Sequence, residues 1–416
     1  MKNKFIYVFA CLLITISGNS QTLSDYLIIA EKNDPELKAL GYRYESALEK
    51  VTEVGSLPDT SIGLGYFVQE AETRVGAQKG KISIAQKLPW FGTLEAIKES
   101  ASYKAEAQQN TIDFTKRKLF LAVKKSYFEL YELKEKERIL TENIEILKTF
   151  EKLALNELEN NRSSMVDVLK IKMEKNELNN NLSTILENLE AKIIAFNLLL
   201  SRSENETVKI IDTILITSNE PLFNKNSISQ NPKLLKLDNL KLALVKAELA
   251  VKKEGLPTIG IGLDYVFVEN RPVDNLIDNG KDVIMPMVTL SIPLFSKKYS
   301  SKQKQLNLEQ KAIETTKTSV TNQLNTIFES AEGNMKSAKI SIQTQIENTK
   351  QANQAQKVLL LPAALERARA AGDERALLSL ARVLRETGGD REVLELLSLD
   401  ETLSRRACRR LRALAR

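Results

Sequence analysis

Two stretches of the chain alternate between apolar residues and small or polar residues. The first covers residues 59–88 and the second covers residues 258–293. Each is a pair of alternating runs separated by a polar loop, and the first loop is predicted around Glu70, Glu72 and Arg74. Because every second side chain of a β-strand lies on the same face, each stretch predicts a β-hairpin with one apolar face.

Between and after these hairpins the apolar residues recur every three to four positions, which predicts long helices. One helix is expected from about residue 92 to 156, followed by a tip at 159–164 and a return helix whose apolar residues include Leu178, Leu182 and Leu186. The mean step in the return helix is about 3.5 residues, which is typical of coiled-coil packing. A similar long helix is expected from about 296 to 357. A shorter helix, from an N-cap at Thr22 to about Ser56, precedes the first hairpin.

The two halves of the chain resemble each other in order and spacing. Leu57-Pro58 and Tyr66 recur as Leu256-Pro257 and Tyr265, in each case 199 positions later. The sequence therefore predicts a tandem duplication, with a first repeat at 21–222 and a second repeat at 223–357. Each repeat is read as a helix, a β-hairpin and long helical segments.

Both ends of the chain differ from this pattern. Residues 1–20 have two lysines, an apolar run and small residues, which predicts a secretory signal peptide. Residues 358–416 contain no lysine and form an Ala/Leu/Arg-rich helical tail. Two explanations remain open: a foreign or frame-shifted tail, or a diverged return helix with its tip at 371–375. No acidic residue follows that second tip, where residues 376–380 are Ala and Leu with one Ser.

Composition excludes several kinds of function. The chain has no histidine and two cysteines, Cys11 and Cys408, so the usual zinc sites and histidine-based catalysis are ruled out. A net charge of +6 over 416 residues, without a dense basic patch, does not indicate nucleic-acid binding. We expect no catalytic residues, no metal site and no cofactor.

The strand pairs and long helices together point to a membrane channel. Strands of about ten residues match the length of a tilted strand that crosses a bilayer. Four strands cannot close around a lumen, and an open edge in lipid leaves backbone groups unpaired. Three chains would supply twelve strands, with the apolar face (Ile62, Leu64, Ile261, Leu263) toward lipid. The opposite face (Ser61, Gly63, Gly65, Asp264, Thr289, Ser291) would line water.

In these features the chain resembles the TolC-type outer-membrane efflux proteins, over residues 21 to about 357. The resemblance is carried by the duplicated order of elements, by Leu57-Pro58, by 89–92 (PWFG) and by 293–295 (PLF). It implies a mainly α protein with a small β part: a homotrimeric helical barrel below a 12-stranded membrane β-barrel, with four strands from each protomer. It also implies an outer-membrane location, a periplasmic adaptor and an inner-membrane resistance-nodulation-division pump as partners. Residues 72–76 (ETRVG) and 89–92 are most similar to the heavy-metal branch, so the exported solutes are expected to be metal ions or drugs.

The resemblance also suggests positions of interest, each with a simpler interpretation. Asn161, Arg162, Ser164 and Asp167 match the tip segment that contacts the adaptor and gates the pore. Ser164 and Asp167 are also a helix cap, and Arg162 is also a solvated tip charge. Trp90 and Phe91 are expected at the membrane interface. Asp264 is expected to face the lumen, where it either influences ion passage or is simply hydrated.

Other classes of protein remain as alternatives. An exported coiled-coil scaffold without a pore would explain the helices but not the two matched strand pairs. A periplasmic adaptor would also lack duplicated membrane-type strand pairs. An exported enzyme would need a constellation of reactive side chains that the sequence does not offer.

Overall fold

The computed structural model describes residues 22–160, 163–214, 225–294, 297–370 and 375–380. The predicted signal peptide, the tip residues Asn161 and Arg162, and most of the predicted tail lie outside these ranges. The chain divides into two compact units, Met1–Gln323 and Leu324–Arg416. The helices and sheet below belong to the first unit, except that the last helix continues into the second.

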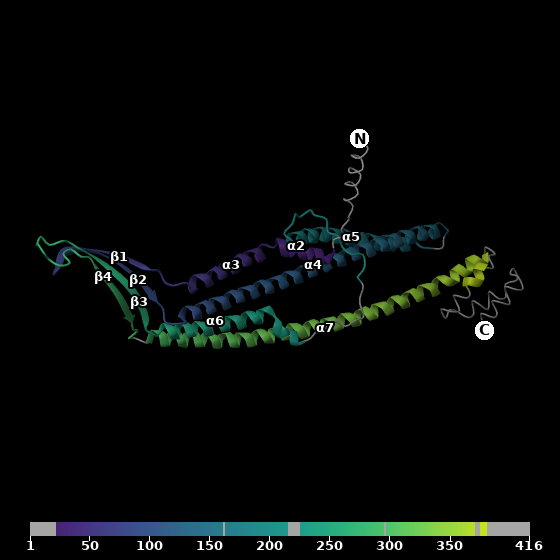
Figure 1. Ribbon diagram of the computed structural model, residues 1–416. Coiled ribbons are helices and arrows are strands. Elements are labelled where there is room, and N and C mark those ends of the chain that lie inside the picture. Colours follow the sequence, from purple (N-terminus) through teal and green to yellow (C-terminus); the bar gives the residue numbers. More distant parts are fainter. Residues whose placement is uncertain (1–21, 161–162, 215–224, 295–296, 371–374, 381–416) are drawn as a thin grey trace, which may run out of the picture. The chain divides into compact units, whose positions relative to one another are not determined.

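The first unit is mainly helical with one small sheet (Figure 1). The helices are α2 (Leu23–Asn33), α3 (Pro35–Gly55), α4 (Thr93–Glu159), α5 (Met165–Leu199), the short 3-10 helix η1 (Lys225–Gln230), α6 (Pro232–Glu254) and α7 (Lys297–Ala370). The strands are β1 (Ser61–Thr73), β2 (Gly76–Leu88), β3 (Thr258–Val268) and β4 (Val283–Ser291). In the part of the chain that the structure describes, no helix is both long and apolar enough to span a membrane.

The single helix expected at the start of the first repeat is in fact two helices. The break falls at Asp34-Pro35, because proline lacks a backbone N–H and its ring clashes with the preceding turn. The Asp34 side chain accepts a hydrogen bond from the Leu37 amide at 2.7 Å and caps α3. Asn231, in front of Pro232, caps α6 by accepting a hydrogen bond from the Lys233 amide at 3.0 Å. The Asx-Pro pairs in the two halves are therefore equivalent helix starts.

The capping box predicted at the first helix is present. The Thr22 side chain accepts a hydrogen bond from the Asp25 amide, and the Asp25 carboxylate accepts one from the Thr22 amide at 2.7 Å. This exchange satisfies two amides that have no partner within the helix. The beginning of α2 is therefore set by local sequence.

The four strands form one antiparallel sheet in the order β1-β2-β3-β4. The first hairpin has a tighter connection than predicted, since β1 includes Glu70 and Glu72 and only Arg74 and Val75 separate it from β2. The polar composition of this segment led to the wrong expectation, because polar side chains can also decorate the end of a strand. Gly76 has a φ of 141°, and a side chain there would collide with the carbonyl oxygen of Glu269. The turn therefore requires glycine.

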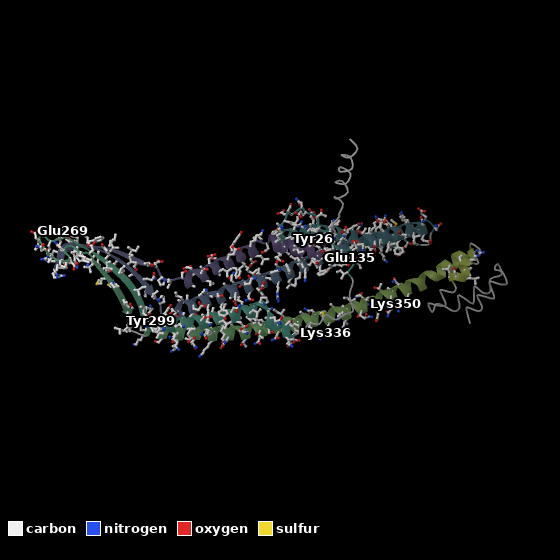
Figure 2. All side chains as sticks on the ribbon, in the orientation of Figure 1. Tyr26, Glu135, Glu269, Tyr299, Lys336 and Lys350 are labelled. Carbon is white, nitrogen blue, oxygen red and sulfur yellow. The ribbon has the colours of Figure 1, made fainter. Side chains whose placement is uncertain are left out.

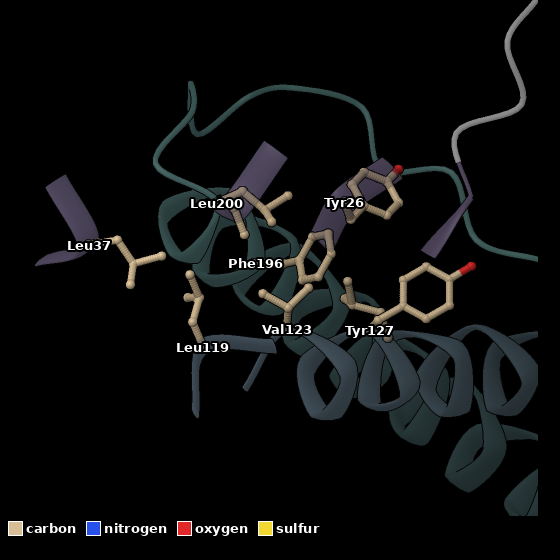
Figure 3. Close-up of a cluster of buried hydrophobic side chains, with 9 residues drawn as sticks. Tyr26, Leu37, Leu119, Val123, Tyr127, Phe196 and Leu200 are labelled. Carbon is tan, nitrogen blue, oxygen red and sulfur yellow. The ribbon is translucent and has the colours of Figure 1, made fainter. Parts of the chain in front are cut away.

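The core of the helical part is a cluster of aromatic and aliphatic side chains from α2, α3, α4 and α5 (Figure 3). Tyr26 and Phe196 stack edge to face with ring centroids 5.2 Å apart. The amides of Lys209 and Ile211 donate to the hydroxyls of Tyr26 and Tyr127, at 2.8 and 3.0 Å. These bonds attach the segment after α5 to the core, and they satisfy two buried hydroxyl groups.

The long helix α4 has 67 residues, which corresponds to about 100 Å at 1.5 Å per residue. It packs against α3 and α6 along one part of its length and against α5 along another (Figure 1). Lys192 of α5 donates to Glu129 of α4 at 2.7 Å, and Lys175 pairs with Glu151. The predicted seam of α5 faces α4 only in part, since Leu178 and Leu182 are half-buried whereas Leu186 is exposed.

The last helix, α7, pairs with α6 through polar side chains. Gln310 donates to Glu248 at 2.7 Å, and Lys241 and Lys317 form ion pairs with Glu314 and Asp238. The helix runs without a break past residue 358, where the predicted tail begins, to Ala370. The change in composition at 358 therefore does not coincide with a break in the backbone helix.

Candidate functional site

One face of the sheet is apolar across all four strands. In the strand register, Ile62 lies opposite Ile84, which lies opposite Leu263, and the next row joins Leu64, Ile82, Tyr265 and Ile284. These side chains are exposed, and Leu64 shows 81% of its surface. The surface continues through the large exposed residues Tyr66, Ile261, Phe267, Val288 and Leu290. An apolar area of this kind marks an interaction with a membrane or with another protein.

The opposite face carries the residues predicted to line water. The register aligns Ser61 with Ala85 and Gly262, and aligns Gly63 with Ser83 and Asp264. Thr289 and Ser291 share this face. The predicted partition of the two faces is therefore confirmed by the register. Met285 and Met287 also lie on the second face, which is less polar than the sequence indicated.

Asp264 is the buried carboxylate of this second face. Its side chain is 1% exposed, and its Oδ2 lies 3.2 Å from the Nζ of Lys81 on the neighbouring strand. In the single chain, Lys81 and the adjacent strands cover this carboxylate, and its position facing a lumen stays a prediction. Its Oδ1 has no hydrogen-bond partner among the described residues. Sequence reasoning did not single out Lys81, which becomes a neighbour of Asp264 only through the pairing of β2 with β3.

The two hairpins are tied together at their far ends, where Figure 2 labels Glu269. Arg271 donates to Glu72 at 2.8 Å, and these residues are separated by 199 positions, the spacing of the repeat. Lys79 pairs with both Glu70 and Glu269. The amide of Gly280 donates to the carbonyl of Val75 at 2.7 Å. Glu72 and Arg271 carry opposite charges at equivalent positions of the two repeats, so the sequence alone could have predicted their contact.

Both outer strands of the sheet have an open edge. β1 pairs only with β2, and β4 only with β3, in the residues that the structure covers. Each edge therefore presents backbone donors and acceptors that can pair with a strand of another chain. The geometry suits a sheet that continues into neighbouring copies.

The junction between strands and helices exposes large apolar side chains. Phe91 is 80% exposed, and its ring lies edge to face with that of Trp90 at a centroid distance of 6.1 Å. Leu294, which matches Trp90 in the second repeat, is 82% exposed. Gly92 adopts a φ of 73° and begins α4 without a side-chain cap. The prediction that Trp90 and Phe91 lie where strand changes to helix agrees with these positions.

At the other end of α4, the predicted cap is present. The Ser164 side chain accepts a hydrogen bond from the Asp167 amide, and the Asp167 carboxylate accepts one from the Ser164 hydroxyl at 2.7 Å. These hydrogen bonds from Ser164 hold the pKa of Asp167 below its usual value. The capping role is therefore present in the structure, whereas contact with an adaptor and pore gating stay predictions. Among the described residues, no three His, Cys, Asp or Glu side chains gather as a metal site.

No family model and no curated protein matches the sequence. The outer membrane protein VceC of Vibrio cholerae matches with a TM-score of 0.56 at 14% identity, over 94% of this chain and 91% of that one. The open-state MtrE outer membrane channel of Neisseria gonorrhoeae gives 0.55 and 14%, over 94% and 83%. The CmeC outer membrane channel of Campylobacter jejuni gives 0.53 and 13%, over 94% and 80%.

At these identities the matches show the fold. It is the fold of TolC-like outer-membrane channels, mainly helical with a four-stranded antiparallel sheet, which confirms the predicted fold class of the single chain.

Proposed function

We propose that the protein is a subunit of an outer-membrane channel and acts as a passive conduit in a tripartite efflux system. The observation that carries this proposal is the continuous exposed apolar face of the sheet, bounded by two open strand edges. In water this face would be costly to expose, and in lipid the open edges would be costly to leave unpaired. Both costs are removed when several copies join their sheets inside a membrane.

We propose that three copies form the channel, as the similarity to outer-membrane channels suggests. Each chain contributes four strands of 9 to 13 residues, which is enough to cross a bilayer at the usual tilt. Twelve strands would enclose a lumen, with Ser61, Gly63 and Asp264 on the inner face and Leu64 toward lipid. Trp90 and Phe91 would then lie at the membrane interface, where aromatic residues are enriched.

The helical part is proposed to extend into the periplasm. The two repeats, 21–222 and 223–357, would each contribute long helices to a helical cylinder. The tip near Ser164 and Asp167, together with Asn161 and Arg162, would contact a periplasmic adaptor. An inner-membrane resistance-nodulation-division pump would deliver the solute, either heavy-metal ions or drugs. Similarity to outer-membrane channels supports these partners, and resistance tests with metal salts and organic toxins on a deletion strain would identify the solute class.

Assembly and conductance test the proposal directly. The full chain, expressed with its own amino terminus and extracted in detergent, is expected to give a trimer by light scattering with detergent correction and steps of ion conductance in planar bilayers. A water-soluble, non-conducting rod would contradict the proposal and favour the coiled-coil scaffold. Protein heated until monomeric serves as the control for conductance that does not depend on assembly.

A further inference from the structure

A pocket of 570 Å³ lies where the sheet joins the helices of the first unit. Its walls come from both repeats: the ends of β2 and β4 and the starts of α4, β3 and α7, with Tyr299 on α7 labelled in Figure 2. Apolar and aromatic side chains, among them Trp90, Ile97 and Ile292, share the lining with polar and charged ones. The pocket is therefore a space between the two repeats, at the point where the strands of each repeat meet its helices.

Thr93 is one of the residues that line this pocket, and its side chain carries a buried hydroxyl. The residue is 3% exposed, and its Oγ1 has no hydrogen-bond partner in the described part of the chain. A buried hydroxyl without a partner is unfavourable, and native proteins seldom keep one without a reason. A ligand oxygen in the pocket would give this group its missing partner.

The start of α4 adds a favourable field for an anion. Thr93 is the first residue of this helix of 67 residues, and the N-cap residue Gly92 offers no side-chain hydrogen bond. The first amides of a helix and its dipole attract negative charge, and phosphate groups bind at such ends. An anion here would therefore meet both the helix end and the Thr93 hydroxyl.

Charged side chains around the pocket favour the same ligand. Lys87 and Lys298 line it, and Glu254 is the one acidic residue among its lining residues. Lys253, beside Gly92, donates to the carbonyl of Phe91 at 3.2 Å. The balance is positive, next to an apolar and aromatic wall. This combination suits a phosphate ester that is attached to an apolar body.

We propose that this pocket binds the phosphate group of a glycerophospholipid. The Thr93 hydroxyl donates to a phosphate oxygen, Lys87 and Lys298 neutralise its charge, and the acyl chains remain in the surrounding membrane. The inference rests on the proposed function, which places the junction of sheet and helices at the membrane surface. The apolar face of the sheet would contact lipid through its hydrocarbon side chains, whereas this pocket would bind a lipid headgroup.

Titration of the purified full chain in a phosphate-free detergent tests this site. The probes are a short-chain phosphatidylglycerol, inorganic phosphate and a short-chain diacylglycerol, which has no phosphate. Phosphatidylglycerol is expected to bind, with about a tenfold loss of affinity in each of Thr93→Val and Lys298→Gln. Thr93→Ser keeps the hydroxyl and should bind normally. Lys252→Gln, which removes an exposed lysine of the same region outside the pocket lining, is the matched control.

Thr93→Val is a useful variant because it removes a hydroxyl that has no partner, so the unliganded fold should tolerate it. Equal binding of phosphatidylglycerol and diacylglycerol, or no effect of Thr93→Val, would overturn the proposal. If inorganic phosphate binds as tightly as phosphatidylglycerol, the proposal that the bound phosphate belongs to a lipid is wrong. Trimer formation and conductance of the same samples are measured in parallel. Conducting trimers without lipid binding would contradict this site only, and lipid binding without conductance would contradict the proposed function only.

Discussion

The helical core buries its apolar side chains, whereas the sheet exposes many of its own. In the helical core, Tyr26, Tyr127 and Phe196 are fully buried against one another within a single chain. In the sheet, Ile62 and Leu64 point away from the protein and remain largely exposed. The backbone hydrogen bonds of the helices close within each helix, whereas the two outer strands of the sheet leave backbone groups unpaired among the described residues. The difference shows that the helical core is completed by the chain itself, whereas the sheet needs a surrounding that the chain does not provide.

The largest effect is expected from Phe196→Ala in the core. Removal of this buried ring should lower the free energy of unfolding by about 3–5 kcal/mol, since it leaves a cavity between Tyr26 and Tyr127. Denaturant unfolding followed by circular dichroism measures the change. Phe128→Ala is the control, because Phe128 contacts the same Tyr127 ring but is 43% exposed. Equal losses in the two variants would show that the core does not depend on this burial.

A charge on the apolar face of the sheet should have the next largest effect. Leu64→Arg is expected to cost about 2–4 kcal/mol in membrane insertion, because this position faces lipid in the proposed assembly. Gly63→Arg adds the same charge one residue earlier, on the opposite face, and should insert normally. Fractionation between membrane and soluble protein gives the readout. If both variants insert equally well, the assignment of the two faces to lipid and water is wrong.

In the helical part, Ser164→Ala should cost about 1 kcal/mol through loss of the cap of α5. The pKa of Asp167 lies below its usual value of 3.8 in the folded protein, because Ser164 donates to its carboxylate. The ionised carboxylate therefore stabilises the fold above about this pH, and the contribution is lost as the pH falls through the folded pKa. Thermal unfolding at pH 7 and pH 3 should show a difference between wild type and Ser164→Ala that shrinks at the lower pH. A difference that grows at pH 3 would contradict this role of Asp167.

The smallest effect is expected at the strand ends, from Glu72→Gln. The pair of Glu72 with Arg271 is largely exposed, so its loss should cost about 0–1 kcal/mol and matter less at high salt. A double-mutant cycle with Arg271→Gln measures the coupling energy. A coupling well above this range would mean that the strand ends are more enclosed than in the single chain.

Much of the fold was predictable because the decisive patterns are local. Alternation placed Ile62 and Leu64 on one face of a strand, and the register confirms this arrangement. Ser164 and Asp167 form a capping box whose spacing is readable directly. The break at Asp34-Pro35 was missed, although proline at that position argues for a new helix start. Glu70 and Glu72 are polar and so predict a loop, but polar side chains also fit the end of a strand, and both residues belong to β1.

The candidate site was less predictable, since its contacts depend on strand pairing between the repeats. Lys81 and Asp264 lie close together because of the register of β2 with β3. No local pattern in either strand determines this register. The unpaired hydroxyl of Thr93 likewise depends on how α4 meets the ends of several strands. Such features require the tertiary arrangement, because residues from distant parts of the chain create the burial.

The two open edges of the sheet also have a consequence for how the protein is made. A newly folded single chain exposes strand edges that can join to any compatible strand, including those of unrelated proteins. In the proposed assembly, correct pairing is an encounter between copies, so its rate rises with their concentration, whereas the helical core forms within each copy independently. Slow production therefore prolongs the interval in which each copy is open to wrong pairing, and fast delivery to a shared membrane site shortens it.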